Sequence, residues 1–278
     1  FAGPRHTMNP LFLRGVGVVS PGFRDWDRAR LVLCGRGEYC PEPLTALQPV
    51  VLPLNERRRA TDATRVALEA AHQAAEHSGI SIDRCHSVFA SADGDTRVFD
   101  RMCETVARDA SAMSPTLFHN SVHNAVAGYW SIGSGCTRPS TSLSAGDGSF
   151  AAGLLEGGVQ LEAGAEAVLL VAYDLPAPEP LHAHRPLLAA FGCAMVLGTE
   201  PGPSCLAVLD LSLVDGAAET PLSGGPAADL EPLRSGNPAA RSLPLLRAVA
   251  AREAAELTLP YLAHCDLRVL VEPHRPGA

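Results

Sequence analysis

Apolar and polar residues follow two different periods along the chain, and these periods predict its first elements. Residues 11–19 (LFLRGVGVV) are rich in β-branched residues and stop at a Ser-Pro-Gly turn signal, which predicts a strand. From residue 57 to residue 78 alanines recur at helical spacing, and Gly79 follows in the position of a left-handed helix terminus. We therefore expect a helix over residues 57–78 that packs closely on a sheet through its alanine face.

The rest of the chain continues the order of strand and helix. Residues 87–92 predict a short strand, and apolar positions between residues 98 and 106 recur at helical spacing. Seven unbroken apolar residues at 167–173 predict a strand that is buried on both faces. Strands that alternate with helices favour an α/β layered fold. The other predicted elements are strands at 137–144, 191–197, 206–213 and 267–271, helices at 150–159 and 242–259, and a surface connection rich in glycine and proline at 216–238.

Composition and charge exclude several classes of function. Hydrophobic residues make up 46% of the chain but aromatic residues only 5%, so the core is built mainly from alanine, valine and leucine. All 22 basic residues are arginines, which excludes a Walker A lysine, a lysine Schiff base and the lysine-dependent serine hydrolases. The 30 carboxylates give a formal net charge of −8, which argues against nucleic acid or an anionic membrane as the main partner.

The cysteines and the first residues of the sequence bear on its location. The eight cysteines form no C-x-x-C pair, which is typical of reduced and mostly buried thiols. The sequence shows no signal segment, and its longest apolar run is far shorter than the ~20 residues of a membrane span. We therefore expect a cytoplasmic protein. Residues 1–7 precede Met8 and a strand-like segment, and we interpret them as a vector remnant.

Residues 140–153 (STSLSAGDGSFAAG) have the order of strand, turn and helix that a nucleophile elbow requires. Such a turn exposes one side chain beside helix amides that can stabilise an oxyanion. Ser144 is the candidate nucleophile of a serine-dependent thioesterase or hydrolase. Ser142, however, stands where the G-x-S-x-G template has its first glycine, and no cysteine lies between Cys136 and Cys193. A tight turn whose glycines permit close packing explains the segment equally well.

Histidines and arginines form the other candidate sites. His119 and His123 are four residues apart, a spacing that metal ligands on one helix use, but no carboxylate or cysteine stands beside them. We predict a hydrogen-bonding or interface role for this pair, no metal site and no cofactor. Arg57, Arg58 and Arg59 open the first long predicted helix, where they fit either a solvated helix end or an acidic protein partner such as an acyl carrier. Cations are unfavourable at a helix N-terminus, which favours the partner.

Four segments in order carry a resemblance to a known family. Together they resemble the β-ketoacyl synthases, and within that family the chain length factors, particularly those of the aryl polyene and type II polyketide kind. The resemblance runs from about Leu11 to the last predicted strand. The segments are NERRRATDATRVALEAA at 55–71, FHNSVHNAVAGYWSI at 118–132, TSLSAGDGSFAAGLLEG at 141–157 and SGNPAARSLPLL at 235–246.

This resemblance implies a thiolase-like fold with two related α/β halves stacked as α-β-α-β-α layers. It assigns residues 8–214 to the N-terminal half and residues 215–278 to an abbreviated C-terminal half. The shortened second half suggests that the chain depends for stability on pairing with a larger synthase.

The resemblance also implies that the chain is not catalytic by itself. In catalytic members the elbow presents a cysteine that accepts the acyl chain, and two histidines of the second half activate decarboxylation of a malonyl thioester. The alignment places Ala145 at the cysteine position, and a methyl group cannot form a thioester. A shift by one residue places Ser144 there. The sequence has no His-Gly dipeptide and no lysine, so the other catalytic elements are missing as well.

The implied partners are a catalytic β-ketoacyl-ACP synthase, in a heterodimer, and an acyl carrier protein, for which Arg57, Arg58 and Arg59 are the candidate contacts. Bulky side chains at the interface would close the acyl tunnel at a set depth and fix chain length by sterics. Phe118 and Trp130 could instead be core aromatics. A hydrolase that uses Ser144 and a homodimeric acyl-binding protein stay open as alternatives. The candidate interface and gate residues are Phe118, His119, Val122, His123, Tyr129, Trp130, Thr141 and Ser142.

Overall fold

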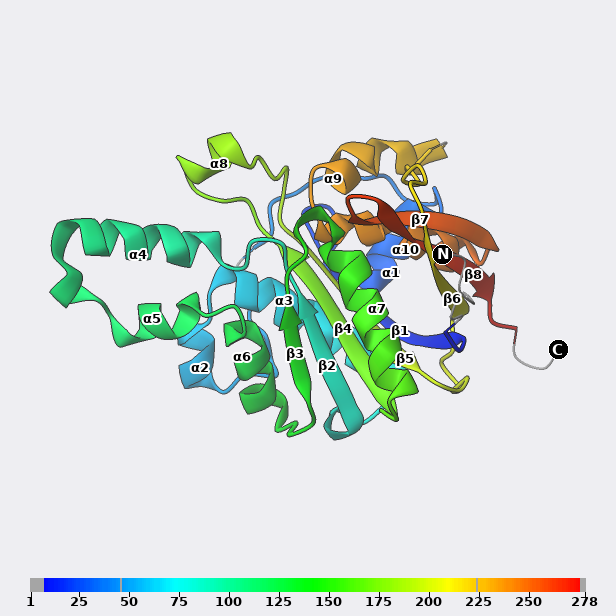
Figure 1. Ribbon diagram of the computed structural model, residues 1–278, viewed down its shortest axis with the longest axis horizontal. Coiled ribbons are helices and arrows are strands. Elements are labelled where there is room, and N and C mark those ends of the chain that lie inside the picture. The colour runs from blue at the N-terminus through cyan, green and yellow to red at the C-terminus, as the bar shows by residue number, and fades with distance from the viewer. Residues whose placement is uncertain (1–7, 46, 224, 276–278) are drawn as a thin grey trace.

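Figure 1 shows the computed structural model of the protein, which describes residues 8–45, 47–223 and 225–275. Residues 1–7, interpreted above as a vector remnant, lie outside the described residues. The strands are β1 Leu11–Val19, β2 Cys85–Ala90, β3 Ser140–Leu143, β4 Ala167–Asp174, β5 Phe191–Gly198, β6 Ala207–Val214, β7 Ala255–Leu262 and β8 Cys265–Pro273. The helices are α1 Trp26–Leu33, α2 Leu54–Arg59, α3 Asp62–Ser78, α4 Thr96–Asp109, α5 Pro115–Ser121, α6 Ala125–Ser134, α7 Ser149–Glu162, α8 Leu181–His184, α9 Glu231–Ser235 and α10 Leu243–Ala251.

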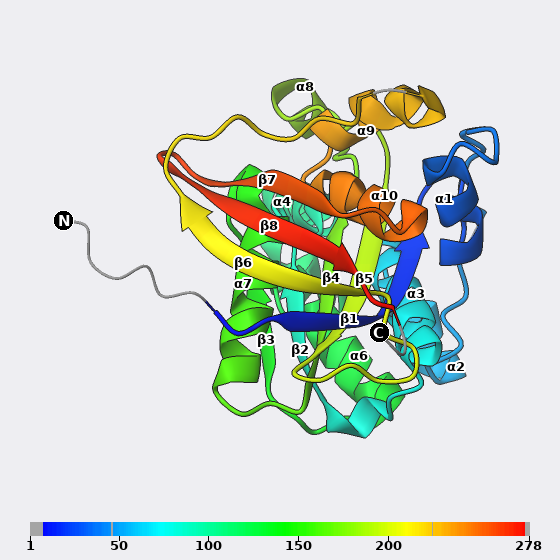
Figure 2. The same cartoon turned by 90° about the vertical axis from the view of Figure 1, so that its right-hand side faces the viewer.

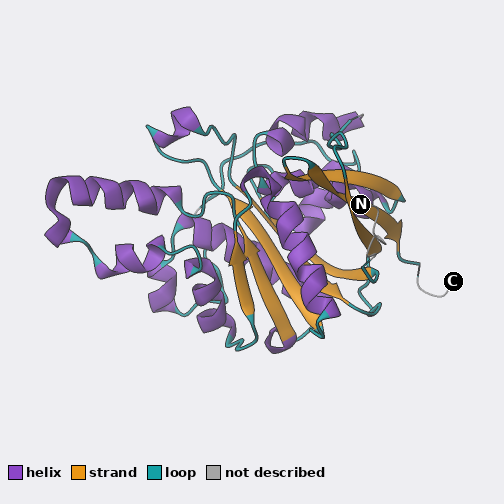
Figure 3. Cartoon of the chain, in the orientation of Figure 1, coloured by secondary structure: helices purple, strands orange, loops and turns teal. Residues whose placement is uncertain are grey.

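Within the described residues, eight strands form one mixed sheet in the order β3-β2-β4-β5-β1-β6-β8-β7. β2 runs parallel to β3 and β4, whereas β5 lies antiparallel between β4 and β1. β4 and β5 are buried along their whole length, as the unbroken apolar run at 167–173 predicts. Figure 3 shows helices on both faces of this sheet. None of the helices in the described part of the chain is long and apolar enough to cross a membrane.

α3 covers one face of the sheet through its small side chains. It begins at Thr61, whose hydroxyl accepts a hydrogen bond from the amide of Thr64 at 3.2 Å, and ends at Gly79 with φ of 65°. A Cβ added to Gly17 of β1 would lie 2.1 Å from the carbonyl oxygen of Ala70, far inside normal contact. The glycines of β1 and the alanines of α3 therefore let the two backbones approach closely, as the alanine face predicts.

α7 and α10 lie on the opposite face, and the C-terminal strands curve over them. α7 contacts β2 and β4 on one side and β7 on the other. Figure 2 shows β6, β8 and β7 continuing the sheet around this layer. Side chains of β6 and β8 alternate between buried and more exposed, which is typical of a sheet with one face in solvent. The predicted α/β fold is confirmed, and β6, β8 and β7 extend the sheet beyond β1.

Two predicted helices have different bounds in the structure. The helix expected over residues 57–78 is split into α2 and α3, because Ala60 is extended with ψ of 131°. The helix expected over residues 242–259 ends at Ala251, where Arg252 adopts a left-handed conformation with φ of 54°. The residues from Ala255 then pair with β8 as β7. This second prediction is wrong because leucines two residues apart also fit one face of a strand, and pairing with β8 decides between the two periods.

The sequence predicts a surface connection at residues 216–238, but in the structure part of this segment is helical and buried. It contains α9, and the side chains of Leu222, Leu230, Leu233 and Arg234 are each at most 5% exposed. The three leucines belong to the core cluster that also includes residues of α1 and α10. Glycine and proline shape the turns of this segment, while its leucines hold it on the body of the protein.

α4 and α5 form an arm, residues 96–121, that extends beyond the sheet (Figure 1). Val98 is the buried residue of α4, whereas Phe99 and Val106 are 57% and 56% exposed. The arm therefore exposes large apolar side chains, Phe99 and Val106 among them, that lie outside the core of this chain. Large exposed apolar surfaces on helices are typical of protein interfaces.

Candidate functional site

Three loops meet at one edge of the sheet because β2, β3 and β4 run parallel and end there. We call residues 91–95 after β2 the arm root, residues 144–148 after β3 the elbow, and residues 175–190 after β4 the strap. The carboxyl ends of parallel strands are where α/β proteins commonly place binding and catalytic groups. The predicted elbow lies at this edge, so this is the candidate functional site.

The backbone of the elbow has the predicted order of strand, turn and helix. β3 leads through Ser144 and Ala145 into a short 3-10 helix, Gly146–Gly148, and then into α7. Gly146 has φ of 55°, and a Cβ on Gly148 would lie 2.3 Å from the carbonyl oxygen of Tyr261 in β7. The first glycine permits the turn and the second permits close packing, so both are explained without catalysis.

The side chains of the elbow offer no activated nucleophile. Ala145 presents only a methyl group, and its amide donates to the hydroxyl of Ser149 at 3.0 Å. The hydroxyl of Ser144 donates to the carbonyl oxygen of Ala92 at 2.7 Å, and the described residues supply it with no imidazole or carboxylate partner. A serine nucleophile needs such a base beside it. The arrangement therefore gives no support to a hydrolase that uses Ser144.

A chain of ion pairs runs across the elbow to residues 219–241. Arg185 of the strap pairs with Asp93 of the arm root and, at 2.9 Å, with Asp147 of the elbow. Asp147 also lies 3.5 Å from Arg241, which pairs in turn with Glu219. The complete chain of pairs is Asp93, Arg185, Asp147, Arg241, Glu219, Arg234 and Glu231.

The two arginines at the Glu219 end of these ion pairs have largely buried side chains. The side chains of Arg234 and Arg241 are 6% and 13% exposed, and both guanidinium groups contact Glu219. Arg234 also binds Glu231 at 2.6 Å, and this hydrogen bond holds the pKa of Glu231 below its usual value. Buried charges of this kind persist when each has a partner, so these pairs fix residues 219–241 against the elbow.

Asp174, the last residue of β4, lies beside the arm root and is 2% exposed. Its Oδ1 accepts hydrogen bonds from the hydroxyl of Ser91 at 2.9 Å and the amide of Ala92 at 2.8 Å. Its Oδ2 is buried and has no partner in the described part of the chain. Burial raises the pKa of Asp174 to about 7, although the two hydrogen bonds act to lower it. This carboxyl group therefore changes its charge near neutral pH.

The segment SGNPAAR at residues 235–241 contains Asn237, whose side chain has a structural role. The side chain is 1% exposed, and its Nδ2 donates to the carbonyl oxygens of Asp174 at 3.1 Å and Ala189 at 2.8 Å. Its Oδ1 accepts from the amides of Ala239 at 3.0 Å and Ala240 at 3.2 Å. All four hydrogen-bonding positions of the amide are used. Asn237 thus joins the segment at residues 237–240 to the end of β4.

The structure separates the candidate gate residues into an exposed and a buried group. Phe118 and Val122 are 61% and 47% exposed, at the arm end that leads into α6. Tyr129 and Trp130 are each 1% exposed and pack in the core with α3. His119 lies between the groups, with its ring edge-on to Tyr129 at a centroid distance of 5.7 Å. Tyr129 and Trp130 are core aromatics of this chain.

The two histidines that are four residues apart do not share a helix. α5 ends at Ser121, and Val122 is extended with ψ of 141°, so His119 lies on α5 and His123 lies in the turn before α6. Nε2 of His123 lies 3.4 Å from the carbonyl oxygen of Ser91. Among the residues that the structure describes, no group of three or more His, Cys, Asp or Glu side chains could hold a metal ion.

β3 is an outer strand of the sheet and carries the other two candidate interface residues, Thr141 and Ser142. The hydroxyl of Thr141 donates to Glu156 at 3.2 Å and accepts from Gln160 at 3.1 Å, so α7 holds it. The hydroxyl of Ser142 is buried and finds no partner among the described residues. An edge strand also offers unpaired backbone groups to a strand of another chain.

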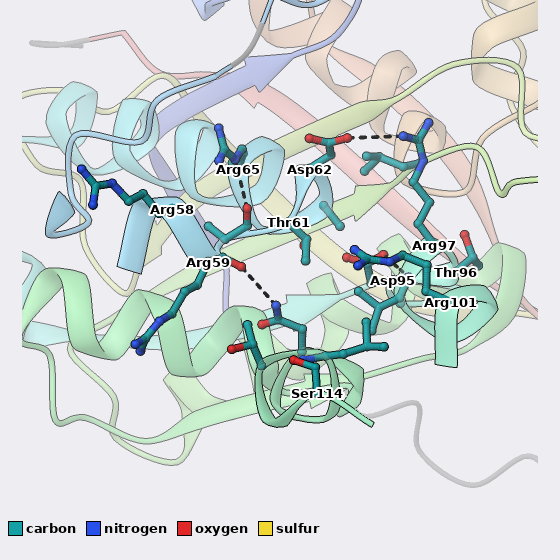
Figure 4. Close-up of a pocket in the computed structure, with 18 residues that line it drawn as sticks. Arg58, Arg59, Thr61, Asp62, Arg65, Asp95, Thr96, Arg97, Arg101 and Ser114 are labelled. Atoms are coloured by element: carbon teal, nitrogen blue, oxygen red, sulfur yellow. Dashed lines mark hydrogen bonds and ion pairs between the residues drawn. The ribbon is translucent and has the colours of Figure 1, made fainter. Parts of the chain in front are cut away.

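Arginines surround a cleft of about 540 Å³ between the start of α3 and the arm (Figure 4). Arg97 pairs with Asp62 across it at 3.4 Å, and Arg65 donates to the carbonyl oxygens of Leu47, Arg57 and Ala60. The cleft is basic on a chain of net charge −8. Its charged lining residues are Arg58, Arg59, Arg65, Arg97, Arg101, Asp62 and Asp95.

The structure corrects the reason given for a partner at the arginine run. Arg57, Arg58 and Arg59 form the last turn of α2 and do not begin a long helix. Cations are favourable at a helix C-terminus, so the helix itself gives no argument for a partner. Arg57 donates to the carbonyl oxygen of Leu52 at 2.9 Å, and Arg59 lies 3.5 Å from Glu56. Only the position of Arg58 and Arg59 on the basic cleft still favours an acidic partner.

Sequence reasoning did not identify Asp93, Asp174 or Arg185. A signal for the first two was present, because each follows a predicted strand and such positions in parallel strands share one edge. Arg185 lies in a proline-rich segment with no periodic pattern, and only the three-dimensional structure places it between the two other loops.

Several solved structures share this fold. The complex of the ketosynthase ApeO with its chain length factor ApeC from Xenorhabdus doucetiae matches with a TM-score of 0.70 and 20% identity, over 94% of this chain and 98% of that chain. The ishigamide ketosynthase/chain length factor matches with a TM-score of 0.75 and 12% identity, over 96% and 100% of the two chains. The AntDE:AntF complex, a type II polyketide ketosynthase with its acyl carrier protein, matches with a TM-score of 0.72 and 11% identity over the same shares.

Comparison at the level of sequence assigns the family. Curated protein sequences give no match. The family described as beta-ketoacyl synthase, N-terminal domain, matches residues 35–232, which include the arm, the elbow and the strap. The thiolase-like fold expected from the sequence agrees with this match and with the solved structures. The chain belongs to the β-ketoacyl synthase family.

Proposed function

We propose that the chain is a chain length factor, a non-catalytic subunit that pairs in the cytoplasm with a catalytic β-ketoacyl-ACP synthase. In this role it would limit the length of the polyene or polyketide chain that the synthase builds. The observation that carries the proposal is Ala145, which stands on an otherwise intact elbow. A methyl group cannot hold an acyl chain as a thioester. The charged groups nearest the elbow are engaged in ion pairs, with Arg185 and Arg241 both on Asp147.

The arm and the edge strand support a partner subunit. Phe99, Val106 and Phe118 expose large apolar side chains on the arm, and β3 has an unpaired backbone edge. Burial of such a surface against another protein would remove apolar area from water, which is the main driving force of association. The solved complexes that share this fold include a ketosynthase with its chain length factor. A catalytic synthase is therefore the partner that we propose.

The exposed apolar members of the candidate gate are Phe118 and Val122. They lie where the arm returns toward the body, and a side chain there can cross an interface into the partner. A bulky group at the end of an acyl tunnel limits the chain by sterics, because each added unit must fit or clash. We propose these two residues as the gate, with His119, His123, Thr141 and Ser142 as further interface contacts.

The basic cleft supports contact with an acyl carrier protein. Arg58 and Arg59 open onto it beside Arg97 and Arg101, and an acidic protein surface would complement this charge. Arg57 is turned toward the carbonyl oxygen of Leu52, so its contribution to such a contact would be smaller. We propose carrier docking at Arg58 and Arg59 on these grounds.

Co-expression tests the proposed pairing. The chain is produced with catalytic ketosynthases encoded in the same genome, and the mixture is separated by size-exclusion chromatography. We expect a one-to-one complex, and elongation of a carrier-bound chain only when both subunits are present. Separate elution of two soluble proteins would count against the proposal, and a discrete dimer of this chain with retained lipid would favour a homodimeric acyl-binding protein instead.

Two matched variants test whether the arm is the interface. Phe99→Asp places a charge on the arm, and Leu262→Asp places one on β7, at residues that are 57% and 58% exposed. Both variants should fold, because neither side chain is in the core. We expect Phe99→Asp to weaken the complex by an order of magnitude or more, since an unpaired charge would be buried at the interface. Leu262→Asp should pair normally, and equal loss in both variants would contradict an interface on the arm.

A further inference from the structure

Arg185 is the one side chain that ion-pairs with both other loops at the candidate site, within the residues that the structure describes. It lies in the strap, and its guanidinium contacts Asp93 through Nε and Asp147 through one of its terminal nitrogens. Its partners follow β2 and β3, so a single group connects the loops that leave three neighbouring strands. A planar guanidinium has several donors in a fixed fork and can hold two carboxylates at once.

Asp147 is well placed to serve as the fixed point of this connection. It lies on the elbow between β3 and α7, two residues from Ala145. Arg241 contacts its second oxygen at 3.5 Å, and Arg241 is in turn held by Glu219. Arg241, which is largely buried and held by Glu219, therefore restrains Asp147. The pair of Asp147 with Arg185 restrains the strap, and the pair of Arg185 with Asp93 restrains the arm root.

Hydrogen bonds also hold the arm root, independently of Arg185, to the end of β4 and to the elbow. The hydroxyl of Ser91 donates to Asp174 and accepts from the amide of Gly94 at 3.0 Å. Ala92 accepts from Ser144 of the elbow at 2.7 Å. These bonds hold the first part of the loop, and Arg185 holds its charged tip at Asp93. The arm root ends at Asp95, whose side chain caps the first turn of α4 at 3.1 Å, so the direction of the arm depends on this loop.

We infer that Arg185 is a positioning residue that clamps the strap and the arm to the elbow, so that the two projecting segments present one surface to the partner subunit. The inference rests on the proposed function for the identity of that partner. In a catalytic elbow this turn aims a nucleophile, whereas here Asp147 anchors the segments around it. Figure 1 shows α4 and α8 extending from the same end of the sheet. Phe99 on the arm and Leu188 on the strap are 57% and 61% exposed.

Hydrogen exchange of the isolated chain tests the clamp without a partner. Arg185→Gln should raise exchange on the order of threefold to tenfold both in residues 92–95 and in residues 176–186, because the first segment loses one ion pair and the second loses two. Arg84→Gln is the control, since Arg84 also forms a solvent-exposed ion pair, with Glu166 at 2.8 Å, and this pair lies before β2 and β4, at the other end of these strands. The control should leave both segments unchanged. Unchanged exchange in either segment of Arg185→Gln would overturn the inference.

Partner affinity tests the role of the clamp. Arg185→Gln should weaken the complex about tenfold while the Tm of the isolated chain stays within about 2 °C, because half-exposed pairs add little to stability. Arg185→Lys should give an intermediate loss, since an ammonium group is a point charge without the planar fork. Asp147→Asn should weaken the complex as well. Equal affinity in wild type and Arg185→Gln would overturn the inference, whereas failure of the wild-type chain to pair at all would overturn the proposed function instead and leave the exchange result to judge the clamp.

Discussion

The hydroxyl of Ser144 donates a hydrogen bond to the carbonyl oxygen of Ala92 over 2.7 Å, and so ties the elbow to the arm root. A catalytic elbow points its reactive side chain toward a substrate and a base. Here the serine is used to join two loops, and the neighbouring Ala145 has no reactive atom. The ion pairs of Asp147 with Arg185 and Arg241 extend the same structural use of the turn.

The bond of Ser144 predicts a structural effect without an enzymatic one. Ser144→Ala should lower the free energy of unfolding by about 1 kcal/mol, the net value of a typical hydrogen bond. Thioester hydrolysis should be at background for wild type and variant alike, because no base lies beside the hydroxyl. Urea denaturation and an acyl thioester assay measure the two quantities. Turnover by wild type that disappears in Ser144→Ala would restore the hydrolase alternative.

The burial of Asp174 predicts a pH-dependent stability. Its pKa is raised from 3.8 to about 7, so the folded state binds a proton that the unfolded state releases between these values. The contribution of this group to stability is therefore complete at low pH and is lost as the pH rises through about 7. At 1.36 kcal/mol per pKa unit the loss is at most about 4 kcal/mol.

Asp174→Asn removes this titration and keeps an oxygen for Ser91 and Ala92. Urea denaturation of both proteins from pH 4 to pH 8 should show little difference at pH 4 and a growing advantage for Asp174→Asn toward pH 8. Other carboxylates titrate equally in both proteins and cancel in the comparison. A difference that does not change with pH would show that the carboxyl group of Asp174 is ionised throughout.

The exposure of Phe118 predicts an effect on product length alone. Phe118→Ala in the reconstituted pair should lengthen the products by at least one extension unit, because it removes bulk from the proposed gate. The stability of the isolated chain should change by less than about 0.5 kcal/mol, as is usual for exposed residues. Mass spectrometry of the carrier-bound products measures the change, with Leu262→Ala on β7 as control. Identical products from the two variants would remove Phe118 from the gate.

The burial of Trp130 predicts the opposite outcome. Trp130→Ala should lower the free energy of unfolding by about 3–5 kcal/mol, because it leaves a large cavity among α3, α6 and the sheet. Products of any pair that still forms should keep their length. Urea denaturation gives the first quantity and product analysis the second. A stable Trp130→Ala variant with longer products would place this side chain in the tunnel.

The sequence was sufficient to predict those elements whose buried positions follow a single clear pattern. β4 and α3 are clear in the pattern because one is buried throughout and the other has a face of alanines. The boundary at Ala60 and the strand from Ala255 could not be predicted, since a single extended residue and pairing with β8 decide them. Tertiary contacts outweigh local propensity at such positions.

The site could be predicted only where a motif marks it. The elbow was found because strand, turn and glycines occur together in sequence, whereas Asp93, Asp147 and Arg185 meet only after three strands align. The sequence suggested that the aromatic residues 129 and 130 lie at an interface, but in the structure they belong to the core. The size of a side chain does not reveal whether it points into the core or toward a partner.

Intact-mass analysis of the reconstituted pair tests the central claim most directly. The complex is incubated with an acyl donor, quenched, and each subunit is weighed by mass spectrometry. We predict an acyl adduct on the partner subunit and none on this chain, because Ala145 has no atom that can form a thioester. An adduct on this chain that persists at a defined residue would contradict a non-catalytic role.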